Sequence, residues 1–366
     1  MIPGSKETLE YLISLIIFMR IACSLGSMLS VNEVLECSKI LSETKVDTVW
    51  IPETWGMENF SILSAVSTNT TTQKIGSSII NIYSRSPAVV AMGAATVDTI
   101  SNQRLILGLG TSSLPIVETF HGYEFERPLQ RMKEYVEIIK LILSGKTVNY
   151  SGEIFNLKNF TLLIKSQRTS IPIYLAAVNK KMVDLTWEIA DGVIFYLRPK
   201  NEMKETIEKM QVKKKIDVTC QIITCISKDS ELAIERAKKT IAFYVSVGKI
   251  YREFLASNGF KKETENIFNE FKKSGFKSNH EFVSNFMLES LCISGTPDEC
   301  KVQLQKFQDT GIDLPIIQFN PIGNVMESFN LLKKHFWMKN DGQSRHCSIW
   351  YNSIYKRRSK NRISIT

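Results

Sequence analysis

Short runs of β-branched and other apolar residues alternate with amphipathic stretches along this chain, and this rhythm constrains the fold more than any other feature. The predicted strands cover residues 20–25, 47–52, 74–80, 104–110, 171–177, 192–197, 218–226 and 315–320. Strand–helix alternation predicts a parallel sheet, because each helix returns the chain to the same end of the sheet. Eight such units favour closure of the sheet into a (β/α)8 barrel of the TIM-barrel class.

The predicted helices fill the intervals between these strands. They cover residues 31–43, 58–67, 87–100, 129–143, 180–190, 200–212, 230–247 and, after the last strand, 324–336. Pro87 stands where the first turn of a helix tolerates proline. Thr296, as an N-cap followed by Pro297, predicts one more helix before the eighth strand.

Two segments interrupt the alternation. Residues 145–163 predict a β-hairpin after the fourth helix, and residues 249–291 predict a mainly helical insertion between the seventh and eighth strands. The expected fold class is therefore α/β, a (β/α)8 TIM barrel over residues 19–338 with insertions after strands four and seven. Insertions that follow barrel strands lie on the face where active sites of such barrels are found.

The Gly-Leu-Gly sequence of Gly108 to Gly110 raises the alternative of a dinucleotide-binding Rossmann fold. That fingerprint needs a third glycine where Ser113 stands, and it follows the first strand of its domain. Here the two glycines end the fourth predicted strand. Small residues at the carboxyl end of a strand instead let a flat ring or a phosphate approach the backbone, so Gly110 becomes a candidate cofactor contact.

The positive charge of the chain is unevenly distributed, which limits the kind of partner that its body can bind. The net charge of the 366 residues is +9, but residues 339–366 hold seven basic side chains against one acidic, which leaves about +3 for the body. We expect this basic tail to be disordered, and the body not to bind nucleic acid.

The cysteines and histidines indicate neither disulfides nor a metal site. Seven scattered cysteines without a CxxC pair indicate reduced thiols in a cytoplasmic protein. The four histidines lack the paired spacing of zinc ligands, so no metal site is expected.

The N-terminal residues 1–18 precede the first predicted strand and are expected to be an extension upstream of the native start. They contain an apolar run, residues 9–18. That run is too short to span a bilayer, and a weak signal anchor is the alternative. We therefore expect no membrane span.

Five segments carry a resemblance to a known family. "GSSIINIYSRSPAVVAMGAATVDTISNQRLILGLGTSS" (76–113) is similar to the luciferase-like monooxygenase superfamily. The segments "VDTVWIPETWG" (46–56), "FHGYEFERPLQRMKEYVEIIKLIL" (120–143), "IPIYLAAVNKKMVDLTWEIADGVI" (171–194) and "SGTPDEC" (294–300) agree in order and spacing. The sequence looks most like the coenzyme F420-dependent branch that includes methylenetetrahydromethanopterin reductase. The resemblance covers about residues 19–336, and none of the motifs fixes the substrate.

The resemblance implies where a cofactor lies. The family's third strand carries a bulge with a non-prolyl cis peptide behind the cofactor ring, and the matching pair is Ser78–Ile79. Asn81 then lies beside the ring edge. The cofactor-contacting segments after the fourth and fifth strands match Thr111, Ser112 and Ser113, and Ala176, Ala177 and Val178.

Two residues are candidates for catalysis. Glu53 matches a ring-contacting acidic position after the second strand, and His121 lies in the loop after the fourth. The alternatives are a solvated strand-end carboxylate and an ordinary loop histidine. Related sugar-phosphate dehydrogenases have a catalytic His where Thr54 stands and a Glu where Ser113 stands, so their acid–base machinery is not expected here.

The resemblance implies an oxidoreductase that transfers a hydride between coenzyme F420 and a small organic substrate. The first alternative is an FMN-dependent monooxygenase on the same fold. The second is a non-catalytic subunit that only binds cofactor. The family analogy also suggests a homodimer.

Overall fold

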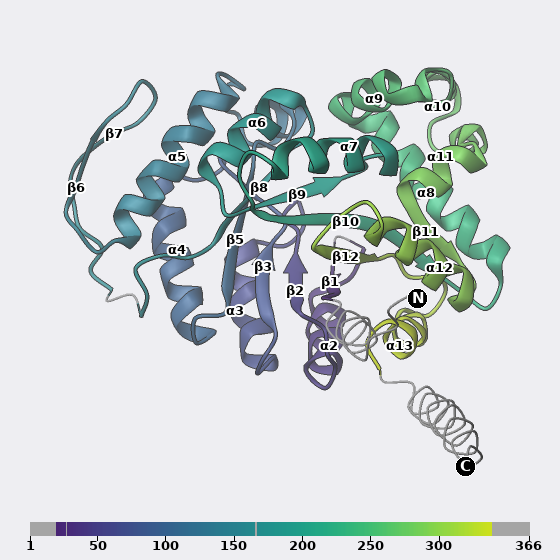
Figure 1. Ribbon diagram of the computed structural model, residues 1–366, viewed down its shortest axis with the longest axis horizontal. Coiled ribbons are helices and arrows are strands. Elements are labelled where there is room, and N and C mark those ends of the chain that lie inside the picture. The colour runs from purple at the N-terminus through teal and green to yellow at the C-terminus, as the bar shows by residue number, and fades with distance from the viewer. Residues whose placement is uncertain (1–19, 27, 165–166, 339–366) are drawn as a thin grey trace, which may run out of the picture.

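The computed structural model describes residues 20–26, 28–164 and 167–338, and its main sheet closes into a parallel barrel (Figure 1). Each strand pairs with the next, and the last strand pairs with the first. The strands in ring order are β1 (Ala22–Ser24), β2 (Thr48–Ile51), β3 (Lys74–Ser77), β5 (Leu105–Gly110), β8 (Ile173–Ala176), β9 (Gly192–Tyr196), β10 (Asp217–Ile226) and β12 (Leu314–Phe319). The predicted (β/α)8 barrel is confirmed, and the segments 1–18 and 339–366 lie outside the described residues.

The third strand breaks where the family resemblance expects it to. β3 ends at Ser77, a cis peptide joins Ser78 to Ile79, and the chain resumes as β4 (Ile80–Asn81). β4 pairs in parallel with the end of β5, with Asn81 opposite Gly110. The break turns the residues after it toward the carboxyl end of the barrel.

Helices surround the barrel and begin close to their predicted positions. They are α2 (Val31–Ser42), α3 (Asn59–Asn69), α4 (Pro87–Ile100), α5 (Pro128–Leu143), α6 (Lys180–Ile189), α7 (Lys200–Gln211), α8 (Ser230–Val247), α12 (Pro297–Gln308) and α13 (Val325–Phe336). Side-chain caps fix the starts of several of these helices: the Ser86 hydroxyl accepts from the Val89 N–H, and the Asn179 carboxamide accepts from the Met182 N–H.

The interior of the barrel is filled by one apolar cluster. It consists of Ala22, Trp50, Ile106, Tyr174, Ile194, Leu314 and Ile316, with Ile79 packed against it. Gly76 has no side chain because a Cβ there would lie 2.5 Å from the Trp50 ring. At the amino end, the Arg20 Nε lies 3.1 Å from Asp47 and its Nη1 lies 3.0 Å from Asp217, so one guanidinium joins two strands. The interior of the barrel is therefore filled by side chains, as is usual for barrels of this class.

The larger apolar core lies between the barrel and its helices. The six described cysteines, at positions 23, 37, 220, 225, 292 and 300, are buried and unpaired, as core-filling thiols are expected to be.

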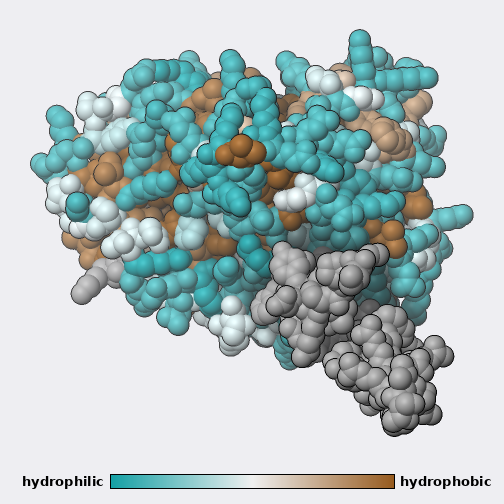
Figure 2. Space-filling view, in the orientation of Figure 1, coloured by the Kyte–Doolittle hydropathy of each residue, from teal (hydrophilic) through white to brown (hydrophobic). Residues whose placement is uncertain are grey.

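Figure 2 shows one face of the molecule as mainly hydrophilic, with apolar residues exposed in several places. Within the described ranges, no helix has the length and apolar character that crossing a bilayer requires.

The two interrupting segments form separate structures at opposite ends of the molecule (Figure 1). The hairpin consists of β6 (Val148–Ser151) and β7 (Asn156–Phe160), which pair antiparallel. The second segment contains α9 (Lys249–Leu255), η2 (Ala256–Phe260), α10 (Lys261–Ser274), η3 (Asn279–Phe282) and α11 (Asn285–Leu291). A short strand that the sequence did not predict, β11 (Cys292–Gly295), follows and pairs with the outer end of β10.

Glu134 attaches the hairpin to α5. Its side chain is buried and accepts hydrogen bonds from the backbone N–H groups of residues 153, 154 and 155 at 2.8, 3.0 and 3.0 Å. Burial alone would raise the pKa of this carboxyl, but the hydrogen bonds from Gln130 and these three N–H groups lower it below its ordinary value.

We expect Glu134→Gln to lower the free energy of unfolding by about 2 kcal/mol at neutral pH, because an amide N–H₂ would face backbone donors. The pKa of this carboxyl is lower in the folded protein than in the unfolded protein. Its charged form therefore stabilises the fold in full at pH values above the unfolded pKa, and this stabilisation is lost as the pH falls through the folded pKa. Urea unfolding at a series of pH values should therefore show the difference between the two proteins shrinking in acid. Glu188→Gln, an exposed change on α6, serves as the control and should cost less than about 0.5 kcal/mol.

Candidate active site

A pocket of about 310 Å³ opens at the carboxyl end of the barrel. It lies between the loop after β2, the turn after β4 and the loop after β5. Its walls are Glu53, Thr54, Trp55, Gly56, Met57, Glu58, Asn81, Ser84, Arg85, Ser112, Ile116 and His121. Four of the twelve predicted site residues, Glu53, Asn81, Ser112 and His121, therefore share one cavity.

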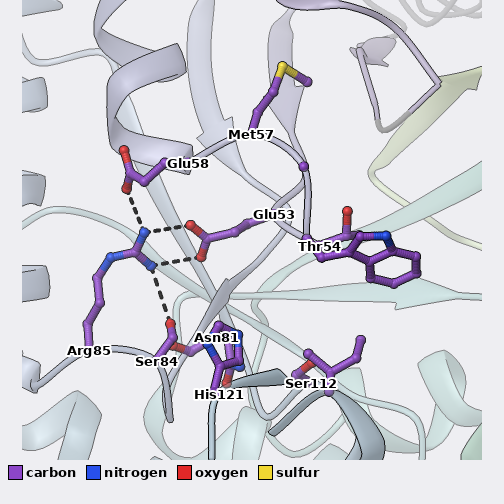
Figure 3. A pocket seen from close by; sticks show the side chains of 12 residues that line it. Glu53, Thr54, Met57, Glu58, Asn81, Ser84, Arg85, Ser112 and His121 are labelled. Carbon is purple, nitrogen blue, oxygen red and sulfur yellow. Dashed lines mark hydrogen bonds and ion pairs between the residues drawn. The ribbon is translucent and has the colours of Figure 1, made fainter. Parts of the chain in front are cut away.

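Arg85 is the centre of the charged wall of this pocket (Figure 3). Its Nη1 lies 2.8 Å from Glu53 Oε2, and its Nη2 lies 2.6 Å from both Glu53 Oε1 and Glu58 Oε1. Glu58 in turn caps α3 by accepting from the N–H groups of residues 60 and 61. The paired carboxylates raise the pKa of the Arg85 guanidinium, although burial opposes this effect. Arg85 thus fixes the loop after β2 against the turn after β4.

Both carboxylate oxygens of Glu53 act as hydrogen-bond acceptors. Besides the two bonds from Arg85, Oε1 accepts from the Asn59 N–H at 3.2 Å. Because every contact comes from a donor, this geometry is that of a bound carboxylate and not of an acid poised to give a proton. His121 is the other predicted catalytic residue, and its exposed side chain lies on the opposite wall of the pocket.

Asn81 presents an unused donor to the pocket. Its Oδ1 accepts from the Tyr83 N–H at 3.0 Å, which fixes the orientation of the carboxamide. The Nδ2 group is buried and has no hydrogen-bond partner, and the residue is only 4% exposed. Buried polar groups are almost always paired, so this donor indicates the position of a ligand acceptor.

The residues of the strand break lie next to the pocket. The buried Ser78 hydroxyl has no hydrogen-bond partner. Ile79 lies across Gly110, where a Cβ would come within 2.7 Å of the Ile79 side chain and 3.3 Å of the Ala176 Cβ. Ile79, Gly110 and Ala176 are therefore neighbours, and Ser78 adjoins them in the chain.

The remaining predicted residues are more scattered. Thr111 and Ser113 flank Ser112, whose φ of 57° lies in the left-handed region. The Ser113 carbonyl accepts a hydrogen bond from the Val117 N–H in the helix that follows. Ala177 packs in the core between barrel and helices. The Val178 carbonyl accepts from Arg198 at 2.6 Å.

No group of three or more His, Cys, Asp and Glu side chains arranged to hold a metal ion occurs in residues 20–26, 28–164 and 167–338. The polar groups that line the site instead consist of one ion-paired network, hydroxyl and carboxamide groups, and one imidazole. This set is suited to binding an organic molecule through hydrogen bonds.

Comparison with known proteins identifies the family. The sequence model described as "Luciferase-like monooxygenase" matches residues 13–314. This chain belongs to the luciferase-like monooxygenase family. It is 31% identical over 309 residues to a 5,10-methylenetetrahydromethanopterin reductase of Archaeoglobus fulgidus, a match that covers 81% of this chain and 92% of that protein.

Solved structures of other luciferase-like proteins share the fold. The coenzyme F420-dependent tetrahydromethanopterin reductase from Methanopyrus kandleri superposes with a TM-score of 0.75 at 23% identity, covering 87% of this chain and 98% of the other. An F420-dependent secondary alcohol dehydrogenase, in complex with an F420–acetone adduct, reaches a TM-score of 0.69 at 16% identity with the same coverage. At these identities the likeness establishes the barrel architecture alone.

Sequence reasoning missed the Arg85 network of this luciferase-like protein. Arg85 stands in "IYSRSP", between the broken third strand and the helix that begins at Pro87. A basic residue after one strand and acidic residues after the neighbouring strand are the signal that could have revealed it. Ser84 and Ile116, which also line the pocket, carry no such signal.

We expect Arg85→Met to lower the free energy of unfolding by about 2 kcal/mol, because it leaves the largely buried Glu53 carboxylate without its cationic partner. Glu53→Gln in the same background should restore part of this loss, since a neutral amide needs no cation. The double-mutant cycle, measured by urea unfolding, should therefore be non-additive. Strict additivity would show that the two side chains do not interact energetically.

Proposed function

We propose that this protein is an F420-dependent oxidoreductase that transfers a hydride between coenzyme F420 and a small organic substrate. The observation that carries the proposal is the unpaired Asn81 donor beside the strand break, at the mouth of a luciferase-like barrel. The names of relatives support the choice of cofactor: a Methanopyrus kandleri reductase that shares the fold is described as coenzyme F420-dependent, and a Mycobacterium tuberculosis protein named as a putative coenzyme F420-dependent oxidoreductase is 27% identical.

The residues present fit a planar cofactor with ring carbonyl groups. The Asn81 N–H₂ would donate to a ring oxygen, and the Ser78 hydroxyl offers a second unused group. Gly110 and Ala176 present little side-chain bulk around Ile79, so a flat ring would meet few protruding atoms. When bound, F420 supplies the hydride chemistry, whereas the protein orients the reactants and excludes water.

Glu53 and His121 take different parts in this proposal. Glu53, held by Arg85 and the Asn59 N–H, would position the loop after β2 and accept a hydrogen bond at the rim of the pocket. His121 lies on the pocket wall and can exchange protons with solvent, so it is the better candidate for moving a proton. The substrate class we propose is a methylene-bearing tetrahydropterin, after the activity for which several relatives are named. The homodimer stays a prediction by family analogy.

Cofactor titration tests the choice between F420 and FMN. We expect the purified protein to bind F420 with a micromolar or lower Kd and to bind FMN at least tenfold more weakly, measured by quenching of cofactor fluorescence. Tighter binding of FMN, with oxygen consumption on reduction, would instead favour the monooxygenase alternative. This alternative has support from a structural relative that binds FMN, a Baeyer–Villiger monooxygenase component with a TM-score of 0.60.

Asn81→Asp tests the contact that carries the proposal. The change keeps the acceptor for the Tyr83 N–H but replaces the free N–H₂ with oxygen, so F420 affinity should fall roughly tenfold or more. Asn156→Asp, the same change on the hairpin, is the matched control and should leave the Kd unchanged. Equal F420 affinity in all three proteins would remove Asn81 from the cofactor site.

Turnover of methylenetetrahydromethanopterin separates the enzyme from a non-catalytic subunit. We expect His121→Gln to lower kcat by roughly a hundredfold, with an F420 Kd within about twofold of the wild type. Glu53→Gln is expected to slow turnover more than it weakens F420 binding. Tight F420 binding without turnover in the wild type would favour the cofactor-binding subunit.

A further inference from the structure

Across the barrel mouth from Asn81, three neighbouring strands present polar side chains to the interior. Tyr196 on β9 and Gln318 on β12 each lie two residues beyond a member of the interior cluster, Ile194 and Ile316. Side chains alternate along a strand, so both point inward, above the apolar plug. Gln221 on β10, which lies between β9 and β12, donates from Nε2 to Gln318 Oε1 at 3.4 Å.

These inward groups have unused hydrogen-bonding capacity. Gln221 is only 9% exposed, and its Oε1 has no partner. The Tyr196 hydroxyl has no partner in bonding geometry, although Tyr244 and Gln318 lie next to it. The fully buried Ser24 hydroxyl on β1, beside β12, is also unpaired. Each of these groups lowers the stability of the fold, because burying a polar group without a hydrogen-bond partner costs free energy. Stability therefore does not explain why they are present.

Aromatic rings from α8 and from the helical insertion lie at the same place. Tyr244 on α8 and Tyr251 on α9 have ring centroids 5.1 and 5.7 Å from Tyr196, and 6.0 Å from each other. All three pairs meet edge to face, at 83° to 87°. The three tyrosine residues stay partly exposed, while their hydroxyls are closely surrounded by protein. The aromatic rings therefore border the space beside the polar groups.

The surroundings of Tyr196 are neutral. The described residues in ring or hydrogen-bonding contact with it, Tyr244, Tyr251 and Gln318, carry no charge. Burial raises the pKa of the Tyr196 and Tyr244 hydroxyls, so both remain protonated donors near neutral pH. An anionic or cationic substrate group would lose its hydration here without gaining a counter-charge.

We propose that Tyr196, Gln221 and Gln318 form a substrate-recognition site for the edge of an uncharged planar ring that carries a hydrogen-bond acceptor beside a donor. The Tyr196 hydroxyl donates to the acceptor, the Gln221 Oε1 accepts from the donor, and Tyr244 and Tyr251 flank the ring. This site rests on the proposed function, since it places the substrate opposite the cofactor face at Asn81. It also gives the helical insertion a part in substrate specificity, because the insertion supplies the ring of Tyr251.

The test uses the full-length protein with Tyr196→Phe and Gln221→Met. Kinetics with F420 and methylenetetrahydromethanopterin should show a KM for the pterin raised roughly tenfold in each variant, the equivalent of one lost hydrogen bond. The kcat should change less than threefold, and the Kd for F420 should not change. Calorimetric titration of tetrahydromethanopterin into cofactor-free protein should show a similar loss of affinity.

Tyr150→Phe is the matched control, because its hydroxyl bonds to Glu137 on the far side of α5 and not at the barrel mouth. It should leave every constant unchanged. Unchanged KM and calorimetric Kd in Tyr196→Phe and Gln221→Met would overturn the site, as would a wild-type protein that does not bind tetrahydromethanopterin. A wild type that fails to bind F420 would overturn the proposed function instead, and the cofactor-free titration would still decide the site.

Discussion

The way the barrel interior is filled determines where this protein can bind anything. One apolar cluster, with Trp50 at its centre, plugs the ring of strands, and the Arg20 ion pairs join strands at the amino end. Above the plug, the inward positions change from apolar side chains to Ser24, Ser78, Gly110, Tyr196 and Gln318. Because the amino half is packed solid, the carboxyl end is left as a shallow cup with polar groups on its walls.

The two halves of this cup are built by different means. On one side, the break at Ser78–Ile79 ends the ladder of the third strand and turns Asn81 toward the pocket. Arg85 then ties the adjacent loops together through Glu53 and Glu58. On the other side, the strands run on unbroken and carry Tyr196 and Gln221, while α8 adds the ring of Tyr244 and the helical insertion adds the ring of Tyr251. Under the proposed function, the first half would receive the flat cofactor and the second half the molecule that reacts with it.

Membership of the luciferase-like family narrows the chemistry without fixing it. The structures that share this fold include F420-dependent enzymes and an FMN-containing oxygenase component. The fold is common to both, so the side chains at the mouth must decide between them. In this chain those side chains are a bound carboxylate, an exposed imidazole and several neutral hydrogen-bonding groups. Such a set can orient a substrate and a hydride carrier but offers little acid–base machinery of its own.

The sequence by itself determined the barrel, because each strand and helix is encoded by a local pattern. The starts at Pro87 and Ser230 were predicted to the residue, and the family resemblance located the cis peptide and Asn81. Tertiary structure alone decided the features that depend on pairs distant in sequence. Arg85 meets Glu53 across 32 residues, and Tyr196 meets Tyr251 only because the insertion folds back over the mouth. Likewise, β11 is too short to give a local sequence pattern, and it forms because β10 extends beyond the ring of barrel strands and offers it a partner. Glu134 is buried only because the hairpin covers it.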